Sequence, residues 1–297
     1  MSATPEASSD RRDAAPGPFP PASPPSRTAL LRAADGVPIE AAYAPGPGPA
    51  APGAPAIVVA HGFTGALERP AIRRAAAVFA QRAAVVTFSF RGHGGSGGRS
   101  TVGDREVLDL AAAVAWARSL GHGRVATVGF SMGGSVVLRH GALYRGAERG
   151  DGRGRGGRTA AYADAVVSVS SPARWYYRGT APMRRLHWVV ERRVGRTVSR
   201  LALKTRVHHR RWNPEPLSPT AAVPLIAPVP LLVVHGTRDA YFPLDHPRAL
   251  AAAAAPGAAE LWVEEGFGHA ENAADDDLLR RIAAWATEAV GPEGQRT

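Results

Sequence analysis

The 297-residue sequence contains no cysteine, which excludes disulfide bonds, thiolate metal sites and a cysteine nucleophile. One of the 36 basic residues is a lysine, Lys204, so the other 35 are arginines. No apolar run approaches the roughly 18 residues that a membrane-spanning helix needs. The first 27 residues also lack the continuous apolar core of a secretory signal. From these absences we expect a cytoplasmic protein without a membrane span.

From residue 56 onward, apolar runs of strand length alternate with helical patterns. Strands are expected at 57–60, 84–90, 124–129, 163–170, 229–235 and 259–264, and helices at 68–82, 104–120, 132–144, 246–255 and 275–290. Continuous apolar runs are typical of strands that are buried on both faces of a parallel sheet. The alternation therefore predicts an α/β fold, with a mostly parallel central sheet flanked by helices. A hairpin around Asp35-Gly36 is expected to precede it.

Several stretches interrupt this pattern and suggest a domain organisation. Residues 1–27 are rich in Pro, Ser and Ala, and we interpret them as a disordered tail. Residues 28–171 and 227–297 are expected to form the core. Residues 172–226, with several aromatic side chains, are interpreted as a small helical cap inserted between late core strands. The Gly/Arg-rich residues 146–161 indicate a flexible loop.

The sequence Gly129-Phe130-Ser131-Met132-Gly133 has the form G-x-S-x-G and lies between an expected strand and an expected helix. In that context, the serine occupies a strained turn, and the glycines let the strand and the helix approach each other. The turn raises the serine hydroxyl above the sheet, at the positive end of a helix dipole. Ser131 is therefore the candidate nucleophile; the alternative is a glycine-rich turn that carries an incidental serine.

At this motif the chain resembles the α/β-hydrolase superfamily, over roughly residues 28–290. The resemblance implies an acid and a histidine that follow the nucleophile in that order. Asp239 ends the turn after one late expected strand, and His269 ends the turn after the last one. The resemblance thus implies a Ser131, Asp239 and His269 triad. Asp245 is a nearby alternative acid.

The segment His61-Gly62-Phe63-Thr64-Gly65 follows the first parallel strand and looks like the oxyanion loop of the family. The backbone N–H groups of Phe63 and Met132 would bind the developing oxyanion. His61 is interpreted as a structural residue of this loop. The glycine-rich loop Arg91–Gly98 lacks the signatures of a phosphate-binding or dinucleotide-binding loop, and the resemblance implies that it shapes the wall of the site.

A serine nucleophile indicates acyl transfer. The order of the motifs is similar to the branch that contains serine esterases, monoacylglycerol lipases and serine aminopeptidases. We expect hydrolysis of a small-molecule carboxylic ester with a small or medium acyl chain. One alternative is a peptidase or amidase with the same triad, which would need an acid in the cap; Glu191 and Glu215 are the candidates. Another alternative is a non-catalytic scaffold with this fold.

No cofactor or metal ion is expected. The adjacent His208 and His209 would diverge on a helix, and no His/carboxylate set has the spacing of metal ligands. In the cap, Trp175, Tyr176 and Trp188 are candidate substrate-binding residues. Tyr177, Met183 and Trp212 could line the same acyl pocket. The alternative for all six is that they hold the cap onto the core.

The basic charge is segregated along the chain. The formal net charge is +11, but residues 139–211 hold 18 basic and 4 acidic residues, a balance of +14. The remainder of the chain is therefore net −3. This segregation argues against nucleic acid as the partner of the whole protein. It leaves two hypotheses: the basic cap attracts an anionic ester or an anionic surface, or it is a solvated surface without such a role.

Overall fold

The computed structural model describes residues 27–48, 53–144 and 161–291. Within these ranges, eight strands form one sheet in the order β1-β2-β4-β3-β5-β6-β7-β8. The strands are β1 Arg27–Arg32, β2 Pro38–Ala44, β3 Pro55–Ala60, β4 Ala84–Phe88, β5 Arg124–Phe130, β6 Ala165–Val169, β7 Leu231–Gly236 and β8 Ala259–Glu264. β1 and β2 form the expected hairpin, and β2 pairs antiparallel with β4. The pairs from β4 to β8 are all parallel, which confirms the expected mostly parallel sheet.

The burial of the strands follows their position in the sheet. β4, β6 and β7 are buried at every residue, as continuous apolar runs require when helices cover both faces. The edge strands β1 and β8 have partly or fully exposed side chains along their whole length. The two faces of the central strands therefore supply the two halves of the hydrophobic core.

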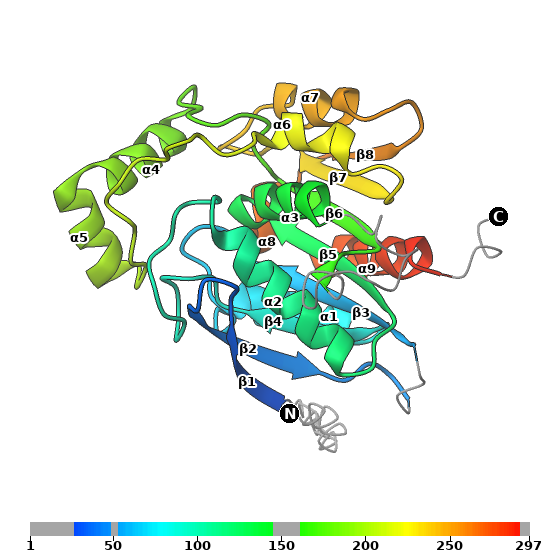
Figure 1. The fold of residues 1–297 in the computed structure, drawn as a ribbon. Coiled ribbons are helices and arrows are strands. Elements are labelled where there is room, and N and C mark those ends of the chain that lie inside the picture. The colour runs from blue at the N-terminus through cyan, green and yellow to red at the C-terminus, as the bar shows by residue number, and fades with distance from the viewer. Residues whose placement is uncertain (1–26, 49–52, 145–160, 292–297) are drawn as a thin grey trace, which may run out of the picture.

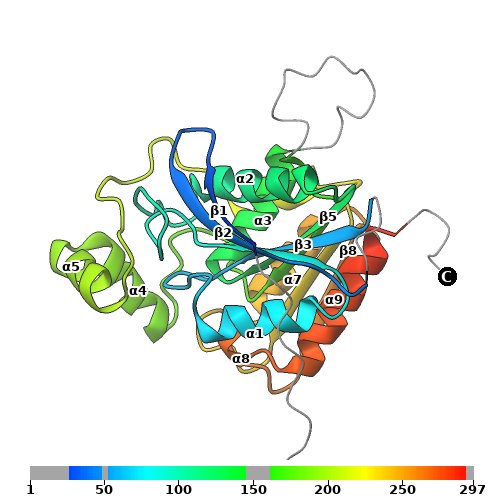
Figure 2. The same cartoon turned by 90° about the horizontal axis from the view of Figure 1, so that it is seen from below.

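Helices cover both faces of the sheet, as Figure 2 shows. α1 (Pro70–Phe79), α8 (Ala270–Ala273) and α9 (Asp276–Ala289) cover one face. α2 (Glu106–Ser119), α3 (Met132–Leu143), α6 (Pro219–Ala222), the 3₁₀ turn η3 (Val223–Leu225) and α7 (Asp245–Ala253) cover the other. The Asp275 side chain caps the N-terminus of α9 by accepting a hydrogen bond from the N–H of Leu278 at 2.8 Å. Asp276 and Asp277 add negative charge in the first turn of α9, where the helix dipole favours it.

The predicted helical cap contains two helices, α4 (Ala181–Glu191) and α5 (Arg193–Ala202). They lie apart from the layers of the core in Figure 1, between β6 and β7 in the chain. The predicted tail and loop concern residues 1–27 and 146–161. Residues 1–26 and 146–160 lie outside the described residues, and the last residue of the predicted tail, Arg27, begins β1.

The C-terminal part of the cap is joined to the core by backbone hydrogen bonds. The N–H of Ser100 donates to the carbonyl of Arg206 at 2.7 Å, and the N–H of His208 donates to the carbonyl of Ser100 at 2.8 Å. The N–H of Arg206 also donates to the carbonyl of Gly92 at 2.8 Å. These bonds fix the segment that follows α5 against the loop that precedes α2.

Across the described ranges, every helix falls short of the length and hydrophobicity that a membrane span requires.

Candidate active site

Ser131 occupies the sharp turn that the G-x-S-x-G motif predicts. It lies between the end of β5 and the start of α3, with φ 52° and ψ −113°, a conformation that is strained for a residue with a side chain. Its N–H donates to the carbonyl of Val169 at 2.8 Å, which holds the turn against β6. A Cβ atom at Gly133 would lie 2.7 Å from the carbonyl carbon of Ala60, so only glycine lets α3 approach β3 this closely.

Two hydrogen-bond contacts connect the three residues of the implied triad in the order Ser131, His269 and Asp239. The Ser131 hydroxyl oxygen is 2.9 Å from His269 Nε2, and His269 Nδ1 is 2.8 Å from Asp239 Oδ2. The three side chains come from the ends of β5, β7 and β8, which the parallel sheet brings to one edge. A hydroxyl, an imidazole and a carboxylate in this order form the arrangement that activates a serine nucleophile.

The Asp239 side chain is fully buried and is held by several donors. Its Oδ1 accepts hydrogen bonds from the N–H groups of Tyr241 and Phe242, at 2.8 and 3.0 Å. Burial raises the pKa of Asp239, but His269, the N–H of Phe242 and His235 together lower that pKa by more, so it lies below the usual value. The alternative acid, Asp245, is about half exposed and pairs with Arg174 at 2.7 Å. The structure therefore brings Asp239, and not Asp245, to the histidine.

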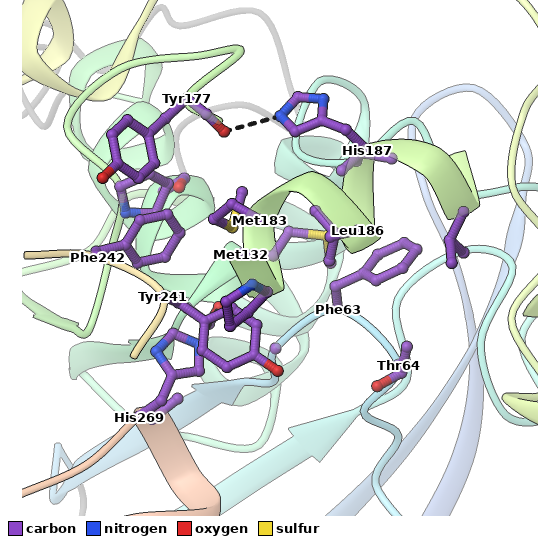
Figure 3. Close-up of a pocket in the computed structure, with 18 of the residues that line it drawn as sticks. Phe63, Thr64, Met132, Tyr177, Met183, Leu186, His187, Tyr241, Phe242 and His269 are labelled. Carbon is purple, nitrogen blue, oxygen red and sulfur yellow. Dashed lines mark hydrogen bonds between the residues drawn. The ribbon is translucent and has the colours of Figure 1, made fainter. Parts of the chain in front are cut away.

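The aromatic ring of Tyr241 stacks on the imidazole of His269, with ring centroids 4.1 Å apart. Figure 3 shows this pair at the edge of a cavity that is also lined by Phe63 and Met132. The stacked ring, together with the bonds to Asp239, restricts the rotation of the imidazole.

The predicted oxyanion donors, Phe63 and Met132, line the same cavity as Ser131. Met132 is the first residue of α3, so its N–H has no acceptor within the helix and is available to a ligand. Buried His61 accepts a hydrogen bond from the N–H of Phe90 at Nε2, at 3.0 Å. Its Nδ1 therefore carries the proton and donates to the carbonyl of Gly62 at 2.7 Å. Burial lowers the pKa of His61 well below its usual value, which agrees with the predicted structural role.

Comparisons with known proteins agree with this geometry. A family model described as the alpha/beta hydrolase fold matches residues 55–149, which include β3, the predicted oxyanion loop and the turn that contains Ser131. The sheet order agrees with this fold, and the structural neighbours cover the rest of the core as well. The chain has the α/β-hydrolase fold. This confirms the fold class, and the family-model match supports the superfamily that the motifs indicated.

Solved structures with this fold cover nearly all of the α/β hydrolase core. An esterase of Pyrococcus furiosus, Pf2001, is 20% identical, with a TM-score of 0.66 over 90% of this chain and 92% of the other. An esterase domain of Rhodothermus marinus is 18% identical, with a TM-score of 0.59 over 90% and 100%. A serine hydrolase of Xanthomonas campestris, described as lacking a lid, is 19% identical, with a TM-score of 0.53 over 92% and 96%. No curated protein matches the sequence.

The cavity beside Ser131 in this α/β hydrolase has a volume of about 460 Å³. Trp175 and Tyr176 line it, as predicted, and so do Tyr177, Met183 and Trp212. Trp188 does not: 48% of its surface is exposed, and it lines neither this cavity nor a second cavity beside it. The prediction of a substrate-binding role for Trp188 is therefore not supported by its position.

One of these aromatic residues, Trp212, also attaches the cap to the core. Its indole N–H donates to the carbonyl of Thr101 at 2.7 Å, and its ring packs against Trp175 at 5.1 Å between centroids. Within the cap, the indole N–H of Trp175 donates to the carbonyl of Pro216 at 2.9 Å. Both interpretations from the sequence therefore apply to Trp212, which lines the cavity and holds the cap onto the core.

Glu271 is a residue of the site that the sequence analysis missed. It follows His269 by two residues, is buried and lines the cavity. Its Oε1 accepts a hydrogen bond from the N–H of Gly62, in the oxyanion loop, at 3.1 Å. Burial raises the pKa of Glu271 above the usual value. The motif H-x-E after the last strand was the available signal, but its partner is 209 residues away in the sequence.

The loop Arg91–Gly98 does not shape the wall of the cavity, contrary to the expectation from the family resemblance. The neighbouring residue Val102 lines the cavity instead. The Arg91 side chain is buried and turned away from the site, with bonds of 2.7 Å to both Asp35 and Asp109. The loop is therefore part of a structural ion-pair cluster.

Among the described residues, no group of three or more His, Asp or Glu side chains is placed to hold a metal ion. His208 and His209 are not on a helix, so the predicted divergence of their side chains is wrong: the two rings stack, with centroids 5.0 Å apart.

Proposed function

We propose that this protein is a serine hydrolase that cleaves carboxylic esters of small or medium acyl chain. The observation that carries the proposal is the chain of hydrogen bonds from Ser131 to His269 to Asp239, which lies at a cavity lined mostly by apolar side chains. The order of the three side chains and the distances between them match what nucleophilic acyl transfer requires.

In the first half of the proposed reaction, the Ser131 oxygen attacks the ester carbonyl carbon while its proton moves to His269 Nε2. The tetrahedral intermediate collapses, the bond to the leaving alkoxide breaks, and His269 donates the proton to that alkoxide. Water then attacks the acyl-serine ester in the same way and releases the carboxylic acid. Asp239 keeps the Nδ1 proton in place and stabilises the charged imidazole during both halves.

The oxyanion of each tetrahedral intermediate would accept hydrogen bonds from the N–H groups of Met132 and Phe63. Met132 supplies the first N–H of α3, where the helix dipole also favours negative charge. A fixed donor of this kind lowers the barrier by about 3–4 kcal/mol.

The structural neighbours support ester hydrolysis, because two of those described above are named as esterases. A mostly apolar cavity of about 460 Å³ fits a small or medium acyl chain. The serine esterase branch, the cytoplasmic location and a reaction without a cofactor remain predictions from the sequence.

Hydrolysis of p-nitrophenyl acetate, butyrate and octanoate tests the proposal. We expect the wild type to release p-nitrophenol and to be labelled covalently by a fluorophosphonate probe. Ser131→Ala should lose the label and at least about a thousandfold of kcat. Unchanged turnover by Ser131→Ala, or labelling at another residue, would overturn the proposal.

A second candidate function is hydrolysis of a peptide or amide bond by the same residues. The acids that were predicted to hold a substrate amine are poorly placed: Glu191 pairs with Arg178, and Glu215 lines neither cavity. Glu271 is the acid that does line the cavity with Ser131. Aminoacyl p-nitroanilides in the same panel separate the two functions, because an esterase should leave them intact.

A further inference from the structure

A second cavity, of about 300 Å³, adjoins the cavity that contains Ser131. The two cavities share five lining residues: Val102, Tyr176, Leu186, His187 and Trp212. The two cavities therefore lie side by side and are in contact with the same five side chains. We call the second cavity the basic chamber, because of the side chains that line it.

Four arginines and one glutamate line the basic chamber: Arg178, Arg196, Arg210, Arg211 and Glu191. The lining therefore has an excess of three positive charges when its histidines are neutral. Several guanidinium groups around one cavity create a positive potential that attracts an anion.

The single acid of the chamber neutralises only part of this charge. One oxygen of Glu191 accepts from Arg178, at 2.5 Å, and lies 3.2 Å from His187 Nδ1. Arg196 donates to the backbone carbonyls of Val190 and Glu191 and has no acidic partner among the described residues.

Arg210 and Arg211 are also without an acidic partner in the described part of the chain, and both are exposed. The adjacent His209 lies in the positive potential of the same group of side chains. Local desolvation and the positive charges of His208, Arg210 and Arg196 lower the pKa of His209. The guanidinium groups of Arg196, Arg210 and Arg211 are thus available to a ligand.

The structure assigns to the basic chamber the role of an anion subsite for the substrate of the neighbouring serine. The inferred substrate is an ester with a terminal anionic group, whose carbonyl lies at Ser131 and whose anion is bound by the arginines. This inference rests on the proposed esterase function and specifies its substrate class. Guanidinium groups bind carboxylates and phosphates through paired hydrogen bonds, so either group has the required chemistry.

Matched pairs of substrates test the inference. Each pair consists of a p-nitrophenyl monoester of adipic, suberic or sebacic acid, with a free carboxylate, and the same molecule with that carboxylate methylated. For at least one chain length, we expect kcat/KM to be about tenfold higher for the carboxylate, which corresponds to about 1.4 kcal/mol.

Variants locate the effect within the cap. Arg210→Gln and Arg211→Gln should each remove most of the preference for the carboxylate, through KM, and should leave the methylated substrate unaffected. Arg200→Gln is the matched control, because this exposed arginine of α5 lines neither cavity. An equal loss in Arg200→Gln would mean that the whole cap attracts anions at a distance, which would overturn the subsite.

Calorimetric titration of the Ser131→Ala variant provides a readout without catalysis and distinguishes the two anions. Octanedioate and octyl phosphate are the probes, and octanol is the neutral control. Binding of either anion that Arg211→Gln weakens supports the subsite, and the tighter of the two identifies the anion. If the wild type cleaves both substrates of every pair equally well, the subsite is overturned while the esterase proposal stands. If Ser131→Ala cleaves the methylated substrates normally, the esterase proposal fails instead.

Discussion

At the scale of single residues, Asp239 uses its two carboxylate oxygens for different purposes. One oxygen orients His269, and the other accepts from two backbone N–H groups and so fixes the turn after β7. The sequence supports both a triad acid and a turn cap at this position, and the structure contains both. A carboxylate with this many donors keeps its charge, which is what the imidazolium in the proposed mechanism needs.

Glu271 allows a prediction about pH and stability. Burial raises the pKa of Glu271 above its usual value, although hydrogen bonds from its own N–H and from Gly62 oppose the shift. An acid with a raised pKa in the folded state binds its proton more tightly when folded, so its ionisation destabilises the fold as pH rises. Glu271→Gln keeps an acceptor for Gly62 and removes the ionisation. We therefore expect Glu271→Gln to gain stability relative to wild type at about pH 8 and to gain little at about pH 4.

Thermal unfolding of both proteins across this pH range checks the prediction. Glu271→Ala is the control for the hydrogen bond: it should lower kcat for p-nitrophenyl butyrate, because the oxyanion loop loses its support, while Glu271→Gln should retain most of kcat. A stability difference between Glu271→Gln and wild type that is constant with pH would contradict the assignment of a buried, ionising carboxyl group.

The residues that the sequence could identify are those with a local signal. Ser131 and His269 each end a strand in a glycine-containing turn, and their local context was sufficient. The partners of Arg91 have no such signal, and the H-x-E motif at Glu271 does not reveal its partner, because both roles depend on contacts with residues 18 to 209 positions away in the chain. Such contacts become visible only when the sheet order is known.

At the scale of elements, the sequence predicted most strands and helices to within a few residues, since apolar runs and turn residues mark them. The orientation of the cap helices was harder to predict, because the sequence of a short helix with several arginines does not show which of its faces is buried. On α4, Met183, Leu186 and Val190 recur at helical spacing, and Met183 and Leu186 line the main cavity. Trp188 lies off that face, which explains why it does not line the cavity.

Trp212 and Trp188 provide a matched pair to test how the cap is attached. Trp212→Phe keeps an aromatic ring next to Trp175 and loses the hydrogen bond to Thr101, which is worth about 1 kcal/mol. Because Trp212 lines both cavities, we expect KM for p-nitrophenyl butyrate to rise a few-fold with little change in kcat. Trp188→Phe should change neither value. Steady-state kinetics of the two variants measures KM and kcat. Equal effects of Trp212→Phe and Trp188→Phe on KM would refute the different roles of the two residues.

At the scale of the whole molecule, Arg91 connects three distant parts of the chain. Its side chain is 3% exposed and bonds to Asp109 of α2, which is fully buried, and to Asp35 in the β1–β2 turn. The cluster therefore ties the N-terminal hairpin and α2 to the loop after β4. Removal of the arginine would leave the Asp109 carboxylate buried without a counter-charge.

We expect Arg91→Met to lower the free energy of unfolding by about 3–5 kcal/mol, the usual cost of breaking one side of a buried ion pair. Arg105→Met is the control: its guanidinium also reaches Asp35, at 3.9 Å, but its side chain is 63% exposed. That variant should stay within about 0.5 kcal/mol of wild type. Urea unfolding curves compare the three proteins, and a midpoint for Arg91→Met equal to that of wild type would show that the buried pair is not needed.

The hydrogen bonds between Ser100 and the segment after α5 have a mechanical consequence. They attach His208 and the residues beside it to the core, whereas Arg178 and Arg196 belong to the projecting part of the cap around α4 and α5. The basic chamber thus lies between a wall that backbone hydrogen bonds join to the core and a wall of two helices that side chains attach to it, such as Thr180, which donates to the carbonyl of Tyr241 at 2.9 Å. A shift of α4 and α5 would change the width of the chamber, whereas Ser131, His269 and Asp239 are held by hydrogen bonds of their own. The accepted length of a substrate could then evolve, through substitutions in two short helices, independently of the chemistry.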